Sequence, residues 1–279
     1  MDCEDLMKLA LIDAPLAEQR DAIAQILSER GVSEETVRRA VEWARDGIAL
    51  FERDDAGGLK SRLGGEPLLP EAEEWPKDPG GRPLGFIALV DLSELPDLEP
   101  LPSDGTLLVF WDHQFFELDK MDFVAATRVF HLEPGAPSTT HDPPDAHDAF
   151  GPIPLSGHLM PILGELDDFE VPDADEDHFY DASDEVTRVY EHSLAGRSRD
   201  VQSPVLGEIA YWFDGHVYPE TAERFTEEER NGKGWVLLAQ FEEAEGLEFG
   251  DVGALYLCIP EADLRERRFD RVMGIMQSH

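Results

Sequence analysis

Cationic side chains are scarce in this sequence, and their scarcity argues against two classes of partner. The chain has 23 Lys and Arg against 61 Asp and Glu among its 279 residues, a formal net charge of −38 at pH 7. Such a charge repels the phosphate backbone of nucleic acids and the headgroups of anionic membranes. We therefore expect no nucleic acid and no membrane as partner, and a basic protein as the better candidate. A merely solvated acidic surface is the alternative.

Cysteines and long apolar runs are also rare. Cys3 and Cys258 form neither a paired metal motif nor a disulfide framework, and the apolar surroundings of Cys258 indicate a small buried side chain. No apolar run approaches the roughly 20 residues that span a bilayer. The first residues lack the basic start and apolar stretch of a secretory signal. These features predict a cytoplasmic protein.

Recognisable catalytic motifs are missing as well. The sequence has no Gly-x-Ser-x-Gly elbow, no His-Glu-x-x-His and no Cys–His pair in a suitable local context. Gly64-Gly65 and the stretch 250–253 lack the Lys-Ser/Thr of a P-loop and the dinucleotide spacing, so we expect glycines with positive φ in tight turns. The pattern argues against an enzyme, although catalytic groups can converge from distant segments.

Two polar segments bear on metal binding. Residues 141–148 hold two His and three Asp, but the prolines fix an extended chain and the spacing matches no zinc motif. Residues 173–177 alternate carboxylates like the start of a calcium loop, yet His178 replaces the required Gly and Asp184 the bidentate Glu. We expect a solvated loop at the first segment, and no metal and no cofactor. Weak calcium or magnesium binding by the second segment is the alternative.

Residues 1–56 have the pattern of a helical region. Apolar side chains recur at helical spacing in two stretches, 16–27 and 37–51. Gly31 supplies a stop between them, and Ser33 is a good N-cap for the second. The sequence thus predicts an antiparallel helical hairpin whose apolar faces cover a β-rich body. Coverage by a partner protein is the alternative.

The rest of the chain, residues 57–279, is predicted to be one β-rich domain. Residues 134–161 are rich in Pro, His and Asp and predict an irregular surface loop. For the acidic stretch 165–191, both an ordered and a disordered chain agree with the sequence. A short helix or turn is expected at 261–269. Short apolar or alternating runs separated by Pro-Gly punctuation predict strands at 86–92, 106–111, 123–130, 235–241, 254–259 and 271–276.

Two parts of this domain, about 60–133 and 201–279, can be aligned by eye. Each has a Gly motif, then a Trp, then an apolar strand ending in an acidic residue, and then a Gly-marked turn into another apolar strand. Such self-similarity suggests an ancient duplication. The expected fold class is therefore α+β, with an N-terminal helical hairpin packed on a largely antiparallel, internally duplicated β body; an acidic, Pro-rich insert joins the halves.

Several blocks in the same order resemble the YwqG-like family, a group of bacterial proteins named as a domain of unknown function. Two blocks depart from the family: 205–209 lacks the usual aromatic and Pro, and 88–91 lacks a common Gln. The resemblance implies a β-rich, internally duplicated fold and no established activity. The resembling blocks are 62–70, Trp75-Pro76, 86–92, 101–110, 237–240, 249–257, Ile259-Pro260, Asp263-Leu264, 268–272 and Gln277.

Four residues are candidate binding residues, in a cleft between the two repeats: Arg62, Trp75, Gln240 and Asp251. Core packing is the alternative for Trp75, and hydrogen bonding to its own turn is the alternative for Asp251. The sequence favours a non-enzymatic protein-interaction module with an acidic surface. The alternative is a small-ligand or metal-dependent enzyme with a cleft between the repeats.

Overall fold

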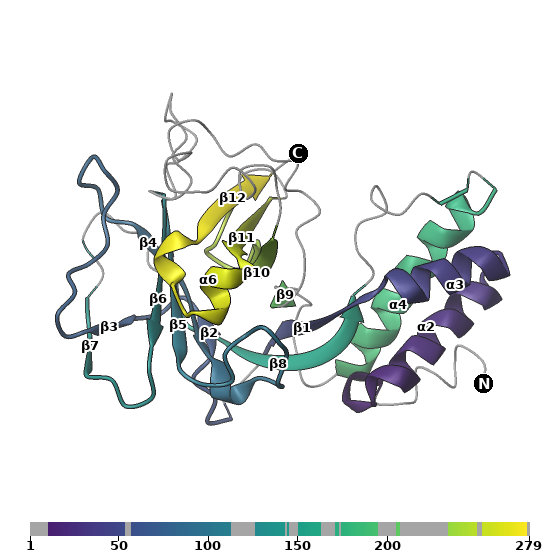
Figure 1. Cartoon of the computed structure of the whole chain (residues 1–279), viewed down its shortest axis with the longest axis horizontal. Coiled ribbons are helices and arrows are strands. Elements are labelled where there is room, and N and C mark those ends of the chain that lie inside the picture. Colours follow the sequence, from purple (N-terminus) through teal and green to yellow (C-terminus); the bar gives the residue numbers. More distant parts are fainter. Residues whose placement is uncertain are drawn as a thin grey trace.

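The computed structural model confirms the predicted fold class. Three of the described α-helices gather at one end of the molecule, and an antiparallel β body that includes a short α-helix forms the other, with β1 and β8 running between them (Figure 1). Among the described helices, none is both long and apolar enough to cross a membrane. The structure describes residues 11–53, 57–112, 126–142, 144, 150–162, 171–172, 174–194, 205–206, 234–249 and 253–277.

The N-terminal helices pack as a hairpin and are joined by a third helix from the acidic stretch. Gly31, with φ of 89°, ends the first helix, and Ser33 caps the second by accepting a hydrogen bond from the backbone N–H of Thr36. Phe179 of the third helix is buried with them in one apolar cluster, so part of the acidic stretch is ordered. The elements are η1 (Leu11–Asp13), α2 (Leu16–Glu29), α3 (Glu34–Trp43) and α4 (Glu176–Leu194).

The second helix is shorter than predicted, because residues after Trp43 form a strand. The strand β1 (Arg45–Glu52) pairs with β8 along its whole length, from Arg45 opposite Ile162 to Glu52 opposite Leu155. Its apolar run is buried on both faces of the sheet. The periodicity of such a short apolar run is the same for a buried strand as for a buried helix, so it does not distinguish them. The prediction of helix through residue 51 was therefore wrong.

Residues 134–161 are also not the irregular loop that was predicted. They contain β7 (Ser138–Thr140) and most of β8 (Ile153–Ile162). The Pro and Gly residues of β8 suggested a loop, but Gly157 is needed inside the sheet. A Cβ there would lie 2.4 Å from Leu95 and 3.1 Å from Ile48, so only glycine lets these side chains approach the strand.

The β body consists of a seven-stranded sheet, a three-stranded sheet and a small two-stranded sheet. The seven-stranded sheet has the order β6-β5-β4-β2-β8-β1-β9, and the others are β10-β11-β12 and β3-β7. All pairings between the described strands are antiparallel. The remaining bounds are β2 (Arg62–Leu63), β3 (Leu68–Pro70), β4 (Gly85–Asp91), β5 (Thr106–Trp111), β6 (Thr127–Leu132), β9 (Val205–Leu206), β10 (Trp235–Glu242), β11 (Ala254–Pro260), α6 (Glu261–Arg265) and β12 (Met273–Gln277).

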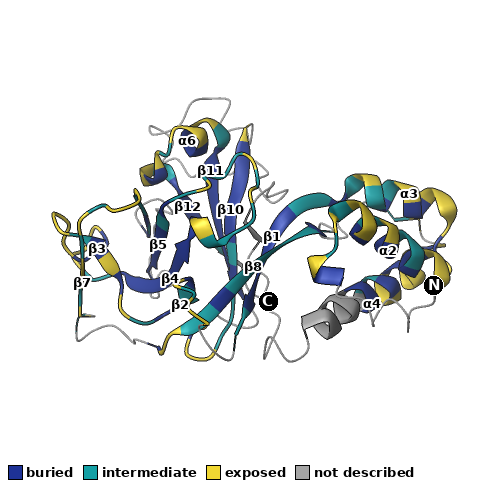
Figure 2. Ribbon diagram, turned by 90° about the horizontal axis from the view of Figure 1, so that it is seen from below, coloured by how far each residue is buried: buried dark blue, intermediate teal, exposed yellow. Residues whose placement is uncertain are grey.

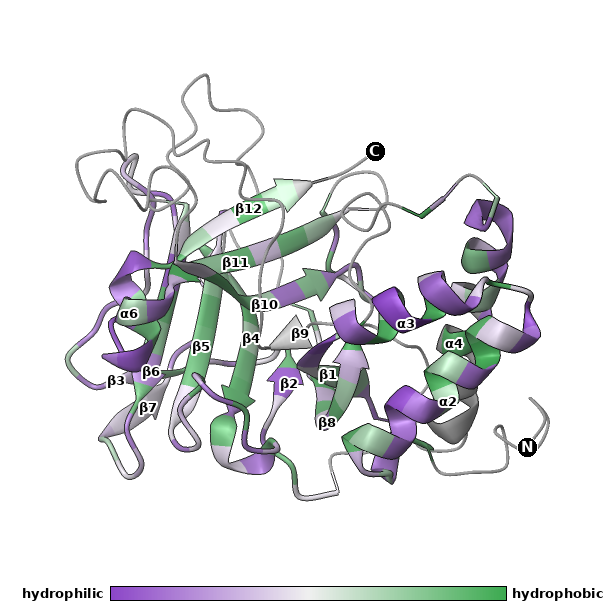
Figure 3. Cartoon of the chain, turned by 45° about the vertical axis from the view of Figure 1, so that its right-hand side comes forward, coloured by the Kyte–Doolittle hydropathy of each residue, from purple (hydrophilic) through white to green (hydrophobic). Residues whose placement is uncertain are grey.

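The strands β4 and β5 are buried on both faces, which places them at the centre of the β body (Figure 2). On the inner face, Ile87 and Val109 share one apolar core with β10–β12, which lie across this part of the large sheet (Figure 3). On the outer face, Phe86 and Phe110 pack with Trp75 in a second cluster. Strands covered on both sides have continuous apolar sequences, as these two do.

Two parts of the β body share a layout. The strands β4-β5-β6 and β10-β11-β12 each form an antiparallel meander. In each meander the register between the first two strands shifts once, between Phe86 and Ala88 and between Leu237 and Ala239. The strands predicted at 86–92, 106–111, 235–241 and 254–259 are confirmed within a residue or two. A common origin of the two halves stays a prediction.

Candidate functional site

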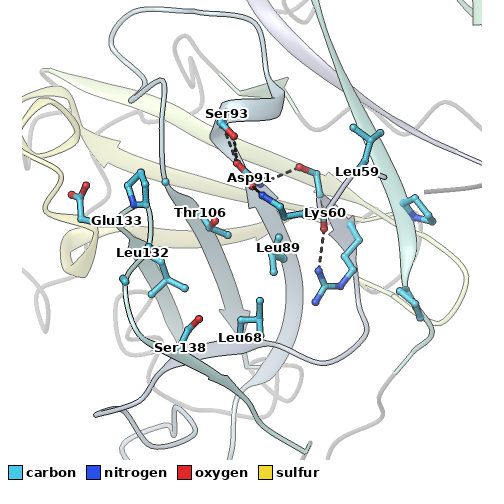
Figure 4. Close-up of a pocket in the computed structure, with 18 residues that line it drawn as sticks. Leu59, Lys60, Leu68, Leu89, Asp91, Ser93, Thr106, Leu132, Glu133 and Ser138 are labelled. Atoms are coloured by element: carbon cyan, nitrogen blue, oxygen red, sulfur yellow. Dashed lines mark hydrogen bonds and ion pairs between the residues drawn. The ribbon is translucent and has the colours of Figure 1, made fainter. Parts of the chain in front are cut away.

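A pocket of about 640 Å³ lies on the outer face of the seven-stranded sheet, opposite the face that packs against β10–β12. Its floor is formed by Leu89 of β4, Thr106 of β5 and Leu132 of β6, with Leu68 and Ser138 beside them (Figure 4). The register explains this floor, since Thr106 lies opposite Leu132 on one side and next to β4 on the other. The volume is in the range of small-molecule pockets.

One wall of the pocket is the chain that leads into β2. Along it, Lys60 is exposed and Arg62 is half-buried, whereas Ser61 and Leu63 are buried. Leu63 belongs to the inner core, so the period of two in extended chain directs the alternate side chains, Lys60 and Arg62, to the outer face. Local strand geometry therefore places two cations in one wall.

Arg62 is held by the turn that follows it. Its Nη1 donates to the carbonyl oxygen of Lys60 at 3.0 Å and its Nη2 to that of Glu66 at 2.6 Å. Gly64 and Gly65 have φ of 62° and 75°, which confirms the prediction of positive φ for this pair, whereas most of the stretch 250–253 lies outside the described residues. A Cβ on Gly65 would lie 3.2 Å from Arg62 Nε, so this glycine also leaves space for the guanidinium.

Burial lowers the pKa of the Arg62 guanidinium, and the charge of Glu66 opposes that effect. An arginine nevertheless remains protonated in proteins. The turn thus holds a partly desolvated positive charge at the pocket wall, where the low dielectric strengthens its attraction for an anion.

Asp91 ends β4 beside this wall and is almost completely buried. Its Oδ2 accepts from Lys60 Nζ at 2.5 Å, and its Oδ1 accepts from the backbone N–H of Ser93 at 3.1 Å and from Ser93 Oγ at 2.6 Å (Figure 4). Burial works to raise the pKa of Asp91, but the hydrogen bonds from Lys60 and Ser93 outweigh it and hold that pKa below its ordinary value. The same contact with Asp91 raises the pKa of Lys60.

Glu94, the last residue of η2 (Leu92–Glu94), holds this wall in place through hydrogen bonds. Its carboxylate accepts from the backbone N–H of Lys60 at 2.8 Å and of Ser61 at 3.0 Å, and from Ser61 Oγ at 2.8 Å. Ser61 Oγ in turn accepts from the backbone N–H of Asp91 at 3.0 Å. The hydroxyl and both carboxylates hold neighbouring chain segments together, which gives the wall a fixed shape.

The opposite wall carries Glu133, which is paired with an arginine outside the pocket. Arg267 Nη1 lies 2.9 Å from Glu133 Oε2, and Arg267 Nη2 lies 2.8 Å from Asp104 Oδ1. In the described part of the chain, the acidic side chains that line the pocket are Asp91 and Glu133. Each of them already contacts a cation.

The structure separates the candidate binding residues. Arg62 lines the pocket, whereas Trp75 lies in the apolar cluster on the same sheet face and donates from Nε1 to the carbonyl oxygen of Leu84 at 2.8 Å. Gln240 is on β10, in the other sheet, where its Nε2 donates to Glu242 Oε1 at 3.2 Å. Asp251 lies outside the described residues.

Sequence reasoning missed Lys60, Asp91 and Leu68 as pocket residues. A signal for two of them was present: a basic residue two positions before Arg62, and an acidic residue that ends an otherwise apolar strand. Their partnership depends on β2 pairing with β4, with Arg62 opposite Leu89, and no local pattern indicates that pairing.

In the part of the chain that the structure describes, no group of three or more His, Cys, Asp or Glu is arranged to hold a metal ion. The His- and Asp-rich stretch 141–148 is described only at residues 141, 142 and 144, so most of it lies outside the described residues, as does Asp173 of the second acidic segment. Cys258 is buried on β11, and burial raises the pKa of its thiol to about 12. At neutral pH this thiol is therefore protonated and unreactive.

Comparison with known proteins places the chain in a family. A search of curated proteins found no match. A family described as a domain of unknown function matches residues 61–278, which begin at the pocket wall and extend through β12. The match covers well over half of the chain, and it includes β2, the glycine turn and β4, which build the pocket. The chain therefore belongs to the family described as a domain of unknown function (DUF1963).

Proposed function

We propose that this protein is a non-enzymatic protein-interaction module that acts in the cytoplasm, and that the outer-face pocket is its binding site. The observation that supports this proposal is that the carboxylates and two hydroxyls of the pocket already have partners within the protein. Asp91 and Glu133 contact Lys60 and Arg267, and Ser61 and Ser93 donate to carboxylates. These groups hold the pocket's shape, around a floor rich in leucine.

Acid–base catalysis at this site has less support. A general base works best when its pKa lies near the operating pH, but the pKa of Asp91 is lowered further from neutrality. The alternative, a small-ligand or metal-dependent enzyme with a cleft between two β repeats, has less support for a second reason. The described residues between the two large sheets form a packed apolar core.

A basic protein is the partner that we propose. The net charge of −38 would steer a basic surface towards this one and repel acidic competitors. Such attraction weakens with ionic strength, because salt screens exposed charges over about 10 Å at 0.1 M. The interaction should therefore depend on salt.

We also propose that the chain belongs with the YwqG-like proteins, and that residues 57–279 are the unit that carries the function. The support is the block from Arg62 through the two glycines, which forms the pocket wall, and the family match over residues 61–278. Residues 1–56 would then add the helices α2 and α3 and also the strand β1, which joins the seven-stranded sheet by pairing with β8.

The test is an affinity capture with the full chain as bait, from an extract of the source cells, at about 50 mM and about 500 mM NaCl. The expected result is a basic protein, stoichiometric by native mass spectrometry, that is retained at low salt and released at high salt. An unrelated bait of equal net charge identifies generic binders of polyanions. A capture without a stoichiometric partner, or with the same proteins on both baits, would contradict the proposal.

A further inference from the structure

We propose that the outer-face pocket binds a small amphipathic carboxylate, with the carboxylate at Arg62 and the apolar body over Leu68, Leu89 and Leu132. This inference rests on the proposed function, in which the pocket binds and does not react. It adds the chemical class of the bound group, which follows from the charges, the donors and the floor of the pocket.

Among the described residues of the lining, one cation has no carboxylate within ion-pair distance, although the charge of Glu66 acts on it. Among the residues that the structure describes, the charged side chains of the lining are Lys60, Arg62, Asp91 and Glu133. Lys60 pairs with Asp91 at 2.5 Å, and Glu133 pairs with Arg267 at 2.9 Å. Within the described structure, Arg62 contacts two carbonyl oxygens and forms no ion pair. One unpaired positive charge matches a monoanion better than a dianion, particularly in a chain of net charge −38.

The guanidinium of Arg62 also has donors to offer. It carries five N–H groups in a planar fork, and two hydrogen bonds to the carbonyl oxygens of Lys60 and Glu66 fix its position. A planar fork suits a carboxylate, which can accept two parallel hydrogen bonds. Because the turn holds the side chain before any ligand arrives, little conformational entropy is lost on binding.

The rest of the pocket suits an apolar body. Leu89 and Leu132 form the floor with Thr106, and Leu68 closes one side (Figure 4). Leu68 has 37% of its surface exposed and is one of the two large apolar side chains that the described part of the chain leaves exposed. Exposed apolar surface inside a preformed pocket contributes to affinity when a ligand covers it. An ammonium ligand would meet Arg62 and be repelled.

The experiment is an NMR titration of the full chain, labelled at leucine methyl groups, with three probes of equal apolar length. These are octanoate, 1-octanol and octylammonium. We expect octanoate to shift the methyl signals of Leu68, Leu89 and Leu132, while those of Leu27, buried in the helical layer, stay in place. Octanoate should bind about tenfold or more tightly than 1-octanol, because a charge-assisted hydrogen bond is stronger than a neutral one. Octylammonium should bind least.

Arg62→Met removes the charge and keeps an apolar stem. It should reduce the preference for octanoate over 1-octanol to nearly none, whereas Arg38→Met, on the exposed face of α3, should leave it unchanged. Circular dichroism checks that both variants fold. If Arg62→Met does not fold, the comparison of the three probes on the unmodified chain still tests the inference. Equal binding of octanoate and 1-octanol, shifts confined to other leucines, or no binding of any probe would overturn the inference.

A further arm distinguishes two sources of the carboxylate. A tetrapeptide ending in Leu is titrated with its C-terminus free and with its C-terminus amidated. Tighter binding of the free form than of octanoate indicates a chain terminus as the source, and weaker binding indicates a free organic acid. Failure of all ligands with intact capture of a basic protein would remove this inference and leave the proposed function standing.

Discussion

Asp91 illustrates how one side chain can organise a pocket. It is the last residue of β4, its side chain is 7% exposed, and it contacts Lys60 on one side and Ser93 on the other. Removing a buried carboxylate leaves its hydrogen-bonding partners unpaired, which costs more than the bonds themselves contributed. The shape of the wall at Lys60 therefore depends on the ionised form of this carboxyl group.

We predict that Asp91→Asn lowers the free energy of unfolding by about 1–3 kcal/mol at neutral pH. The pKa of Asp91 in the folded protein lies below its ordinary value, so its contribution is complete above the ordinary value of about 4 and is lost as the pH falls through the folded value. The raised pKa of Lys60 acts in the other direction, and its contribution is lost only at strongly alkaline pH.

Urea denaturation at pH 7 and at acid pH measures this prediction. The difference between the unmodified chain and Asp91→Asn should shrink as the pH falls below about 4. Glu73→Gln, at an exposed position, serves as the control and should change little at either pH. A difference that stays constant with pH would show that Asp91 does not act through its charge.

At Gly64 the backbone conformation and the available space both require glycine. Its φ is 62°, and a Cβ would lie 2.6 Å from the ring of Phe150 and 2.9 Å from the carbonyl oxygen of Gly151. We predict that Gly64→Ala lowers the free energy of unfolding by about 2–4 kcal/mol, from backbone strain and overpacking together. Thermal or urea denaturation measures the loss.

Gly81 provides a matched control for this prediction. Its φ is 86°, but a Cβ there would meet no atom within 4 Å. Gly81→Ala should therefore cost only the backbone term, about 1–2 kcal/mol. Equal losses in the two variants would mean that Phe150 yields to the added methyl group and that packing against it is unimportant.

At the scale of elements, β1 connects the two ends of the molecule. Its alternate side chains enter different cores, since Ile48 and Leu50 pack with the β body whereas Ala49 and Phe51 pack with the helices. A strand of this kind serves both layers at once. It is therefore the element through which the helical layer is attached to the sheet.

We predict that Phe51→Ala lowers the free energy of unfolding by about 3–5 kcal/mol and loosens the helical layer first. Native-state hydrogen exchange should show faster exchange in α2 and α3 than in β4 and β5 of the same variant. Leu50→Ala is the control, because its side chain points into the opposite core. Indistinguishable exchange patterns in the two variants would contradict the assignment of residues 45–52 to a two-faced strand.

Another element, α4, is tied to the N-terminal helices by polar contacts. Asp175, just before α4, accepts from Ser33 Oγ and from Thr36 Oγ1, each at 2.5 Å. The hydrogen bond from Ser33, and after it the one from Thr36, lowers the pKa of Asp175. A contact across about 140 residues of sequence thus holds the start of α4 against the N-terminal helices, within a strongly acidic stretch that charge repulsion alone would keep extended.

At the scale of the whole molecule, self-repulsion among acidic side chains opposes folding. The net charge of −38 is far larger than a domain needs for solubility. We predict that raising NaCl from about 20 mM to about 300 mM increases the melting temperature, by about 2–4 °C for each kcal/mol of repulsion that is screened. Differential scanning calorimetry measures the shift.

KCl should act like NaCl in this experiment, because screening depends on ionic strength and not on the identity of the ion. A melting temperature that falls or stays level with salt would contradict the prediction. A larger increase with CaCl₂ at equal ionic strength would instead reveal specific cation binding, which is the alternative left open for residues 173–177.

Part of the fold could be predicted because its signals are local. The strands at 106–111 and 254–259, the cap at Ser33 and the stop at Gly31 each depend on a few neighbouring residues. The pocket was predicted only at Arg62, since many of its other lining residues, such as Leu89, Thr106 and Leu132, come from strands far from Arg62 in the sequence. Proximity of that kind depends on strand pairing between distant segments, for which a single sequence holds no local signal.

The sequence by itself determined the large negative charge, the α+β class, the strongly patterned strands and the family resemblance. These properties depend on composition, on short-range periodicity and on the order of blocks. Only the tertiary structure decided that residues 45–52 and 153–162 are strands, and that Lys60 meets Asp91 at a pocket. The physical reason is that a strand obtains its hydrogen bonds from a partner, and the partner of β1 lies about a hundred residues away along the chain.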